Sequence, residues 1–146
     1  MVRKGNPKAI RTVSDLVRKD VRIVNREEGA GARLLLDHHL ALAAVPSAKV
    51  KGYQELASSH LDVAQRIAYG QVDAGIGIGF TAGFLGLDFI PLQQERYDLV
   101  IPTVSLASHP TLSHLFDTIA SHTFRSEIGA VGGYDTQETG TIRKLN

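Results

Sequence analysis

Short apolar runs alternate along the chain with segments of helical periodicity, and this alternation limits the chain to few folds. The runs rich in β-branched or small residues predict strands at 21–24, 50–53, 72–78, 89–92 and 97–101. The helical patterns cover about 12–19, 31–44, 58–69, 81–85 and 110–123. Such alternation favours an α/β fold, with a mostly parallel sheet flanked by helices on both faces.

Capping residues and apolar spacing define the two best helical segments. Gly31 opens the first, whose inward face is predicted by the spacing of Leu34, Leu35, His38, Leu42 and Val45. Ser58 or Ser59 caps the second, with Leu61, Ala64, Ile67 and Ala68 facing inward.

Composition excludes several functional classes. The 146 residues suit one domain, with no cysteine for a disulfide, a thiolate nucleophile or a zinc knuckle. A formal charge of +1 provides no broad basic field, so no direct nucleic-acid binding is expected. No apolar run approaches the roughly 20 residues that span a bilayer, and no secretory signal opens the chain. We therefore expect a cytoplasmic protein with no membrane partner.

The most informative segment is the glycine turn between the first strand and its helix. Asn25 and Arg26 end the strand, Gly29 and Gly31 allow close backbone approach, and free N–H groups at the helix start favour an anion. Arg26 and Arg33 flank the turn and supply paired donors for an oxyanion. The alternative is an ordinary strand–turn–helix connection with surface arginines.

Other chemical motifs are weak. The run after Gly29 lacks the small third residue of a dinucleotide-binding turn, and no P-loop occurs. The six histidines show no metal-ligand spacing, so solvated or capping roles are expected and no metal is predicted. No nucleophile, base and orienting group can be assembled, so the sequence predicts neither an enzyme nor a cofactor.

Two later segments are further candidates. His60 opens a helix, and a strand rich in small residues around Gly75 allows either ligand approach or close packing of helix and sheet. Glu95 and Arg96 lie between two predicted strands, where they form either a crossover salt bridge or the rim of a site, and Tyr97 begins the second of these strands.

Together these segments resemble a known family. The motifs occur in the family's order: Gly5-Asn6-Pro7, Asn25-Arg26 with Arg33 and Asp37, Gly52-Tyr53, His60-Leu61, Asp73-Ala74-Gly75, Phe89 to Leu92, Glu95 to Asp98, and Gly132 to Asp135. The chain resembles the periplasmic-binding-protein-like domain of molybdate-related regulators and molybdopterin biosynthesis proteins. The resemblance implies a type 2 solute-binding fold, whose ligand lies in a cleft between two α/β lobes.

In that fold, residues 1–146 would form a single domain with a truncated first lobe. Residues 21–92 would form the main lobe, and 97–146 a return strand with the C-terminal helices. Ala30 and Ala32 stand where the family usually has hydroxyl residues in the glycine turn, which removes side-chain donors for an oxyanion.

The expected function is noncatalytic binding or sensing of a small oxyanion, with molybdate or tungstate first among candidates. The expected ligand-binding residues come from the turn and from the walls around it: Asn25, Arg26, Gly29, Gly31, Ala32, Arg33, His60, Gly75, Glu95 and Tyr97. The alternative is a protein-interaction or self-associating module that has lost ligand binding. A homodimer or a partner polypeptide would then supply the missing lobe.

Overall fold

A computed structural model describes residues 1–144, and the chain divides into two compact units, Met1–Leu92 and Gln93–Asn146. The first unit contains seven short elements. They are the 3-10 helix η1 (Val13–Val17), β1 (Asn25–Arg26), α1 (Gly31–Leu42), the 3-10 helix η2 (Ser47–Lys49), β2 (Leu56–Ala57), α2 (His60–Ala68) and α3 (Gly79–Phe84).

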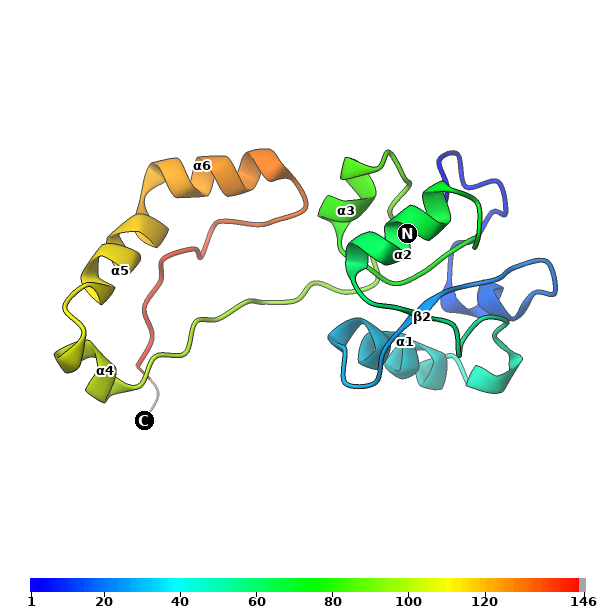
Figure 1. Cartoon of the computed structure of the whole chain (residues 1–146), viewed down its shortest axis with the longest axis horizontal. Coiled ribbons are helices and arrows are strands. Elements are labelled where there is room, and N and C mark those ends of the chain that lie inside the picture. Colours follow the sequence, from blue (N-terminus) through cyan, green and yellow to red (C-terminus); the bar gives the residue numbers. More distant parts are fainter. Residues whose placement is uncertain (145–146) are drawn as a thin grey trace. The chain divides into compact units, whose positions relative to one another are not determined.

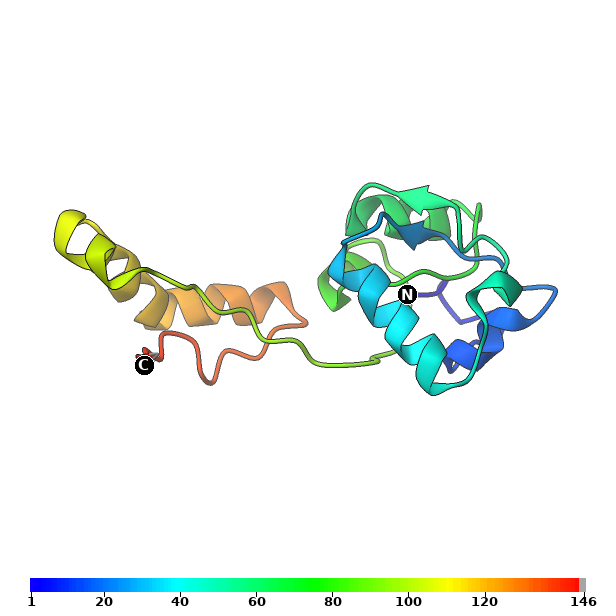
Figure 2. The same ribbon diagram turned by 90° about the horizontal axis from the view of Figure 1, so that it is seen from below.

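The sheet of the first unit is small and partly parallel. β1 and β2 pair in parallel, with Asn25 opposite Leu56, and lie side by side in Figure 2. Isolated bridges extend the sheet: Ile23 pairs in parallel with Ala74, and Val2 pairs antiparallel with Ala74 and Asp88. The α/β class is therefore confirmed, with a far smaller sheet than the sequence predicts.

One predicted strand of this unit is a turn. Residues 50–53 contain Gly52 at φ +87, where a side chain is strained and a Cβ would collide with the carbonyl group of Ile23. The backbone there turns so that the carbonyl of Lys51 accepts from the amide of Ile23 at 2.9 Å. The β-branched Val50 is buried as a core residue of this turn.

Two apolar clusters lie on opposite faces of the sheet. Ile23 joins Leu36 and Leu40 of α1, whereas the next residue, Val24, joins Val63 and other residues of α2. This follows from the two-residue period of an extended strand. Figure 1 shows α1 on one side of β2 and α2 on the other.

The buried stripe of α1 differs from the prediction. Arg33, Leu36 and Leu40 are buried, whereas Leu34 and Leu42 are 61% and 71% exposed. Leucines occur on several sides of this helix, so spacing alone did not identify the inward face. In α2 the buried residues are Val63, Ala64 and Ile67, and Leu61 is exposed.

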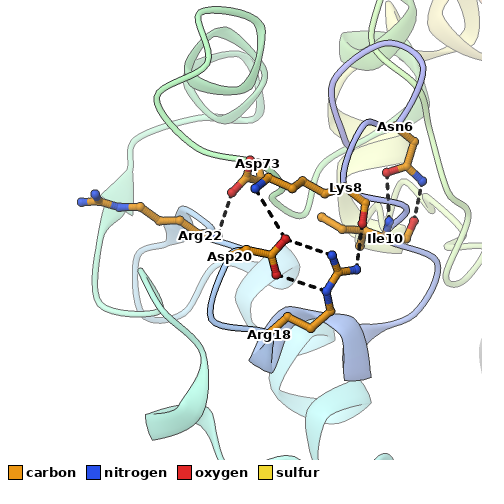
Figure 3. Close-up of polar contacts among 7 residues, drawn as sticks. All are labelled: Asn6, Lys8, Ile10, Arg18, Asp20, Arg22 and Asp73. Carbon is orange, nitrogen blue, oxygen red and sulfur yellow. Dashed lines mark hydrogen bonds and ion pairs between the residues drawn. The ribbon is translucent and has the colours of Figure 1, made fainter.

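Polar contacts hold the N-terminal segment against the first unit (Figure 3). The side chain of Asn6 donates to the carbonyl of Ile10 at 2.7 Å and accepts from its amide at 3.0 Å. Arg18 donates to the carbonyl of Lys8 at 2.7 Å and pairs with Asp20 at 3.0 Å. These contacts fix the path of the chain between its first residues, which lie in the sheet, and the start of η1.

The second unit is helical, with α4 (Thr103–Ser108), α5 (Leu112–Ala120) and α6 (His122–Val131). The strand predicted at 97–101 is wrong: these residues form no strand, and Tyr97 and Val100 are 86% and 78% exposed. The helix predicted at 110–123 ends at Ala120, because Ser121 is extended and caps α6 by accepting from the amide of Phe124 at 3.1 Å. Of residues 93–144, none is buried.

Candidate functional site

Two strand-to-helix turns meet at one edge of the small sheet. Because β1 and β2 are parallel neighbours, the residues that follow them leave the sheet at its carboxyl edge. Residues 27–30 lead from β1 into α1, and residues 58–59 lead from β2 into α2. We call these two segments the paired turns.

The start of α1 carries no side-chain cap. Its N-cap residue, Ala30, is extended at ψ 132, and no side chain accepts from the first turn. The amide of Ala30 donates to the carbonyl of Glu27 at 3.2 Å, which closes the turn, and Gly29 takes the left-handed φ of +84 that this path requires. The amides of Gly31 and Ala32 precede the intrahelical bonding pattern, so they are donors suited to an anion.

The start of α2 is capped internally. Ser59 Oγ accepts from the amide of Asp62 at 3.0 Å, and the carboxylate of Asp62 accepts from the amide of Ser58 at 2.9 Å. Arg66 pairs with Asp62 at 2.8 Å, and this ion pair, with the Ser58 amide, lowers the pKa of the Asp62 carboxyl. The open helix start at the paired turns is therefore that of α1.

Arg26 and Glu27 form a two-point ion pair beside these helix starts. Nε and Nη2 of Arg26 donate to the Glu27 carboxylate at 2.8 and 2.7 Å. The pair, with a smaller contribution from the charge of His60, lowers the pKa of Glu27 to about 2. Both members of the pair are thus ionised at neutral pH.

Arg33 and Asn25 brace the turn from inside the unit. Arg33 is 9% exposed, and its guanidinium lies 5.1 Å from the centroid of the Tyr53 ring and donates to the carbonyl of Arg26 at 3.3 Å. Asn25 donates through Nδ2 to the carbonyl of Tyr53 at 3.2 Å and accepts through Oδ1 from the amide of Arg26 at 2.9 Å. The polar groups of both side chains are therefore bonded to backbone atoms that hold the turn in place.

Tyr53 is fixed in turn by α1. Its hydroxyl donates to Asp37 at 2.5 Å, and this bond raises the pKa of the Tyr53 phenol. The ring is thereby held where Arg33 stacks on it.

Gly75 and His60 border the α2 side of the site. A Cβ on Gly75 would lie 2.5 Å from Cγ1 of Val63 and 3.0 Å from the carbonyl oxygen of Val24, so packing alone requires a glycine there. His60 is the first residue of α2 and is close enough to Glu27 to lower its pKa. Across residues 1–144, no three His, Asp or Glu side chains gather as a metal site.

The structure brings together the expected residues of the first unit: Asn25, Arg26, Gly29, Gly31, Ala32, Arg33, His60 and Gly75. Glu95 and Tyr97 belong to the second unit, where neither is part of a helix or strand and both are exposed. The nearby Arg96 pairs with Asp98 at 2.9 Å.

Sequence reasoning identified the Ser59 cap but missed the roles of Glu27 and Asp62 at the paired turns. Ser59 followed three residues later by Asp62 is a helix-cap pattern and signals the closed start of α2. No pattern in the sequence shows that Glu27 pairs with its neighbour Arg26.

Within residues 1–144, no helix combines the length and the hydrophobicity needed to cross a bilayer. No solved structure matches the chain.

Comparisons with known sequences identify relatives and a family. The chain is similar to the uncharacterized protein YvgK of Bacillus subtilis (strain 168), with 40% identity over 141 residues, which are 97% of this chain but 45% of that protein. An uncharacterized protein in the ferredoxin 2Fe-2S gene 5′ region of Clostridium pasteurianum is 40% identical over 112 residues, 75% of this chain and 96% of the relative. The chain thus spans less than half the length of the Bacillus relative. Residues 1–120 match the PBP superfamily domain model, and the chain belongs to this PBP-like family.

Proposed function

We propose that the chain binds a small oxyanion at the paired turns and catalyses no reaction. Molybdate and tungstate are the first candidates, as the resemblance to the molybdate-related branch of the family implies. The observation that carries the proposal is the uncapped start of α1, at the carboxyl edge of two parallel strands. Anions are stabilised there by unpaired amides and by the helix dipole.

Each residue of the turn has a role in this proposal. The amides of Gly31 and Ala32 bind the anion, and Arg26 supplies a guanidinium at the same turn. Arg33 and Asn25 position the turn, since their donors contact backbone carbonyls inside the unit. With Ala30 and Ala32 in place of hydroxyl residues, the amides carry most of the binding.

The proposal takes the first unit as the main lobe of a type 2 solute-binding fold. The proposal requires a facing lobe that associates with this unit and closes over the anion. Sensing follows if closure on the anion changes that association.

The test removes one amide and leaves the helix. Gly31→Pro deletes the N–H group, and proline is tolerated at the first position of a helix. The preceding residue, Ala30, already has the extended conformation (φ −69, ψ 132) that a following proline demands. Gly31→Ala is the matched control, because it keeps the amide and a Cβ there meets nothing within 4 Å.

Titration calorimetry then measures the affinities of the wild type and both variants for molybdate, tungstate and sulfate. We expect Gly31→Pro to weaken anion binding about tenfold, as for one lost charge-assisted hydrogen bond, and Gly31→Ala to bind like the wild type. Absence of heat from the folded wild type at millimolar anion would end the proposal.

A second candidate function has its own observation. None of residues 93–144 is buried, and Val104, Leu115 and Val131 are 78%, 40% and 45% exposed. An uncovered helical segment of this kind is typical of an interaction or self-association module. Light scattering across a dilution series tests it, and a monomer at every concentration would count against self-association.

A further inference from the structure

Helix α1 carries a second apolar stripe, on a side that does not contact the core. Leu36 and Leu40 are buried in the first unit, whereas Leu34 and Leu42 are 61% and 71% exposed, more than any other leucine of that unit. His38, midway between the exposed leucines, is exposed as well. Residues four apart lie on the same side of a helix, and we call Leu34, His38 and Leu42 the outer stripe.

The charged side chains of α1 do not cover the outer stripe. Between Gly31 and Val45 the charged residues are Arg33 and Asp37. Arg33 is 9% exposed and stacks on Tyr53, and Asp37 accepts from the hydroxyl of Tyr53. A helix that is apolar on two sides is typically covered on both. The outer stripe therefore has the character of a contact surface.

The outer stripe has the same order of residues from either end. Leu34 and Leu42 each lie four positions from His38. A two-fold axis at His38 would therefore bring Leu34 of one copy opposite Leu42 of the other, and the reverse. Four residues advance an α-helix by about 6 Å, so both leucine pairs come into register together. A second copy of this chain thus supplies the surface that the stripe fits.

The charges beyond the two ends of α1 favour an antiparallel orientation. Glu28 precedes the helix and is 91% exposed, and its ion pair with Arg33 is 3.8 Å long. Lys49 follows the helix and is exposed. In an antiparallel pair, the Glu28 end of each helix lies at the Lys49 end of the other, so opposite charges meet. A parallel pair would bring like charges together.

We propose that two copies of this chain associate through an antiparallel pair of α1 helices, with His38 at the two-fold axis and the outer stripe as the contact. The association does not depend on anion binding at the paired turns. Two helices of 12 residues form a small interface, so we expect a weak dimer that forms at micromolar concentrations.

The first experiment places a charge in the contact. Sedimentation velocity across a dilution series measures association at about pH 8, where histidine is neutral. Leu34→Lys and Leu42→Lys should each weaken the dimer about tenfold or more, because a lysine then faces a leucine across the interface. Leu61→Lys is the matched control, since this leucine is exposed on α2, outside the stripe, and its replacement should leave association unchanged.

The second experiment tests the position of the axis. His38→Glu and His38→Lys each place two like charges at the axis, so each variant alone should associate about tenfold more weakly than the wild type. An equimolar mixture of the two should associate more tightly than either alone, because a carboxylate then faces an ammonium group. Circular dichroism confirms that each variant keeps its fold, as expected for exposed positions.

Three results would overturn the proposal. The first is a wild type that stays monomeric at every concentration. The second is a dimer that both leucine variants leave intact, which would place the contact elsewhere, such as on the exposed helices of residues 103–131. The third is a mixture of the two His38 variants that associates no better than its components, which would remove His38 from the axis.

Discussion

Replacing Gly75 by alanine tests whether this residue serves packing or ligand contact. The new Cβ would lie 2.5 Å from Cγ1 of Val63 and 3.0 Å from the carbonyl oxygen of Val24. Val63 is fully buried, so neither its side chain nor the Val24 carbonyl can move without disturbing the core between the sheet and α2. We therefore expect Gly75→Ala to destabilise the first unit by about 1–3 kcal/mol, the usual cost of overpacking.

A second substitution isolates the contact. Val63→Ala alone removes two buried methyl groups and costs about 2 kcal/mol. In the double variant the new methyl group at position 75 enters the space left by Cγ1 of Val63, so the combined loss should fall short of the sum by about 1 kcal/mol. The contact with the Val24 carbonyl persists, so recovery is partial.

Urea unfolding followed by far-ultraviolet circular dichroism measures these free energies, since the chain has no tryptophan to follow. In a unit of this size each kcal/mol also shifts the melting temperature by about 4–8 °C. A Gly75→Ala variant as stable as the wild type would refute the packing argument, and strict additivity would refute the Val63 contact. If Gly75→Ala kept the stability of the wild type and lowered only the affinity for the anion, Gly75 would line the ligand site.

The remaining predictions concern the polar framework. In an NMR titration the Glu27 carboxyl should show a pKa of about 2, lowered from 4.5, so the stability that it contributes is complete above about pH 4.5 and is lost as the pH falls through about 2. Arg26→Gln should return the pKa of Glu27 toward 4.5, and an unchanged pKa in this variant would exclude the ion pair. Tyr53→Phe should lower the unfolding free energy by about 1 kcal/mol because Asp37 loses its donor, and an unchanged urea midpoint would contradict that bond. Ser59→Ala should cost about 1 kcal/mol and speed hydrogen exchange in the first turn of α2, and exchange that remains slow there would show that the cap is dispensable.

The helix starts were predictable because their signals are local. Gly31 opens α1 and Ser59 caps α2 as the sequence indicates, and both depend on a few adjacent residues. The closeness of the two turns was not predicted, because β2 (Leu56–Ala57) lies after the strand expected at 50–53 and its pairing with β1 is seen only in the structure.

The strands were harder to predict because pairing is not local. Residues 97–101 have the β-branched composition of a strand, yet they have no strand partner in the part of the chain that is described. At 50–53 the glycine geometry of Gly52 prevails over the β propensity of Val50.

In the site, residue types were easier to recognise than their roles. Arg33 was predicted as a ligand donor from its charge, but its burial and its stacking on Tyr53 depend on a loop twenty positions away. The pairing of Glu27 with Arg26 depends on side-chain rotamers, which no local pattern in the sequence indicates.

The bridges made by Val2 have a consequence for folding during synthesis. Val2 pairs with Ala74 and with Asp88, so its bridges cannot form until these later residues have been synthesised. On the ribosome, β1 and β2 can meet once α1 and the following loop have emerged, but Val2 stays unpaired until Asp88 has left the exit tunnel. Nascent chains arrested before that point should remain protease-sensitive around Val2. Because synthesis runs from the N-terminus, the bridges of Val2 are the last part of this sheet to form.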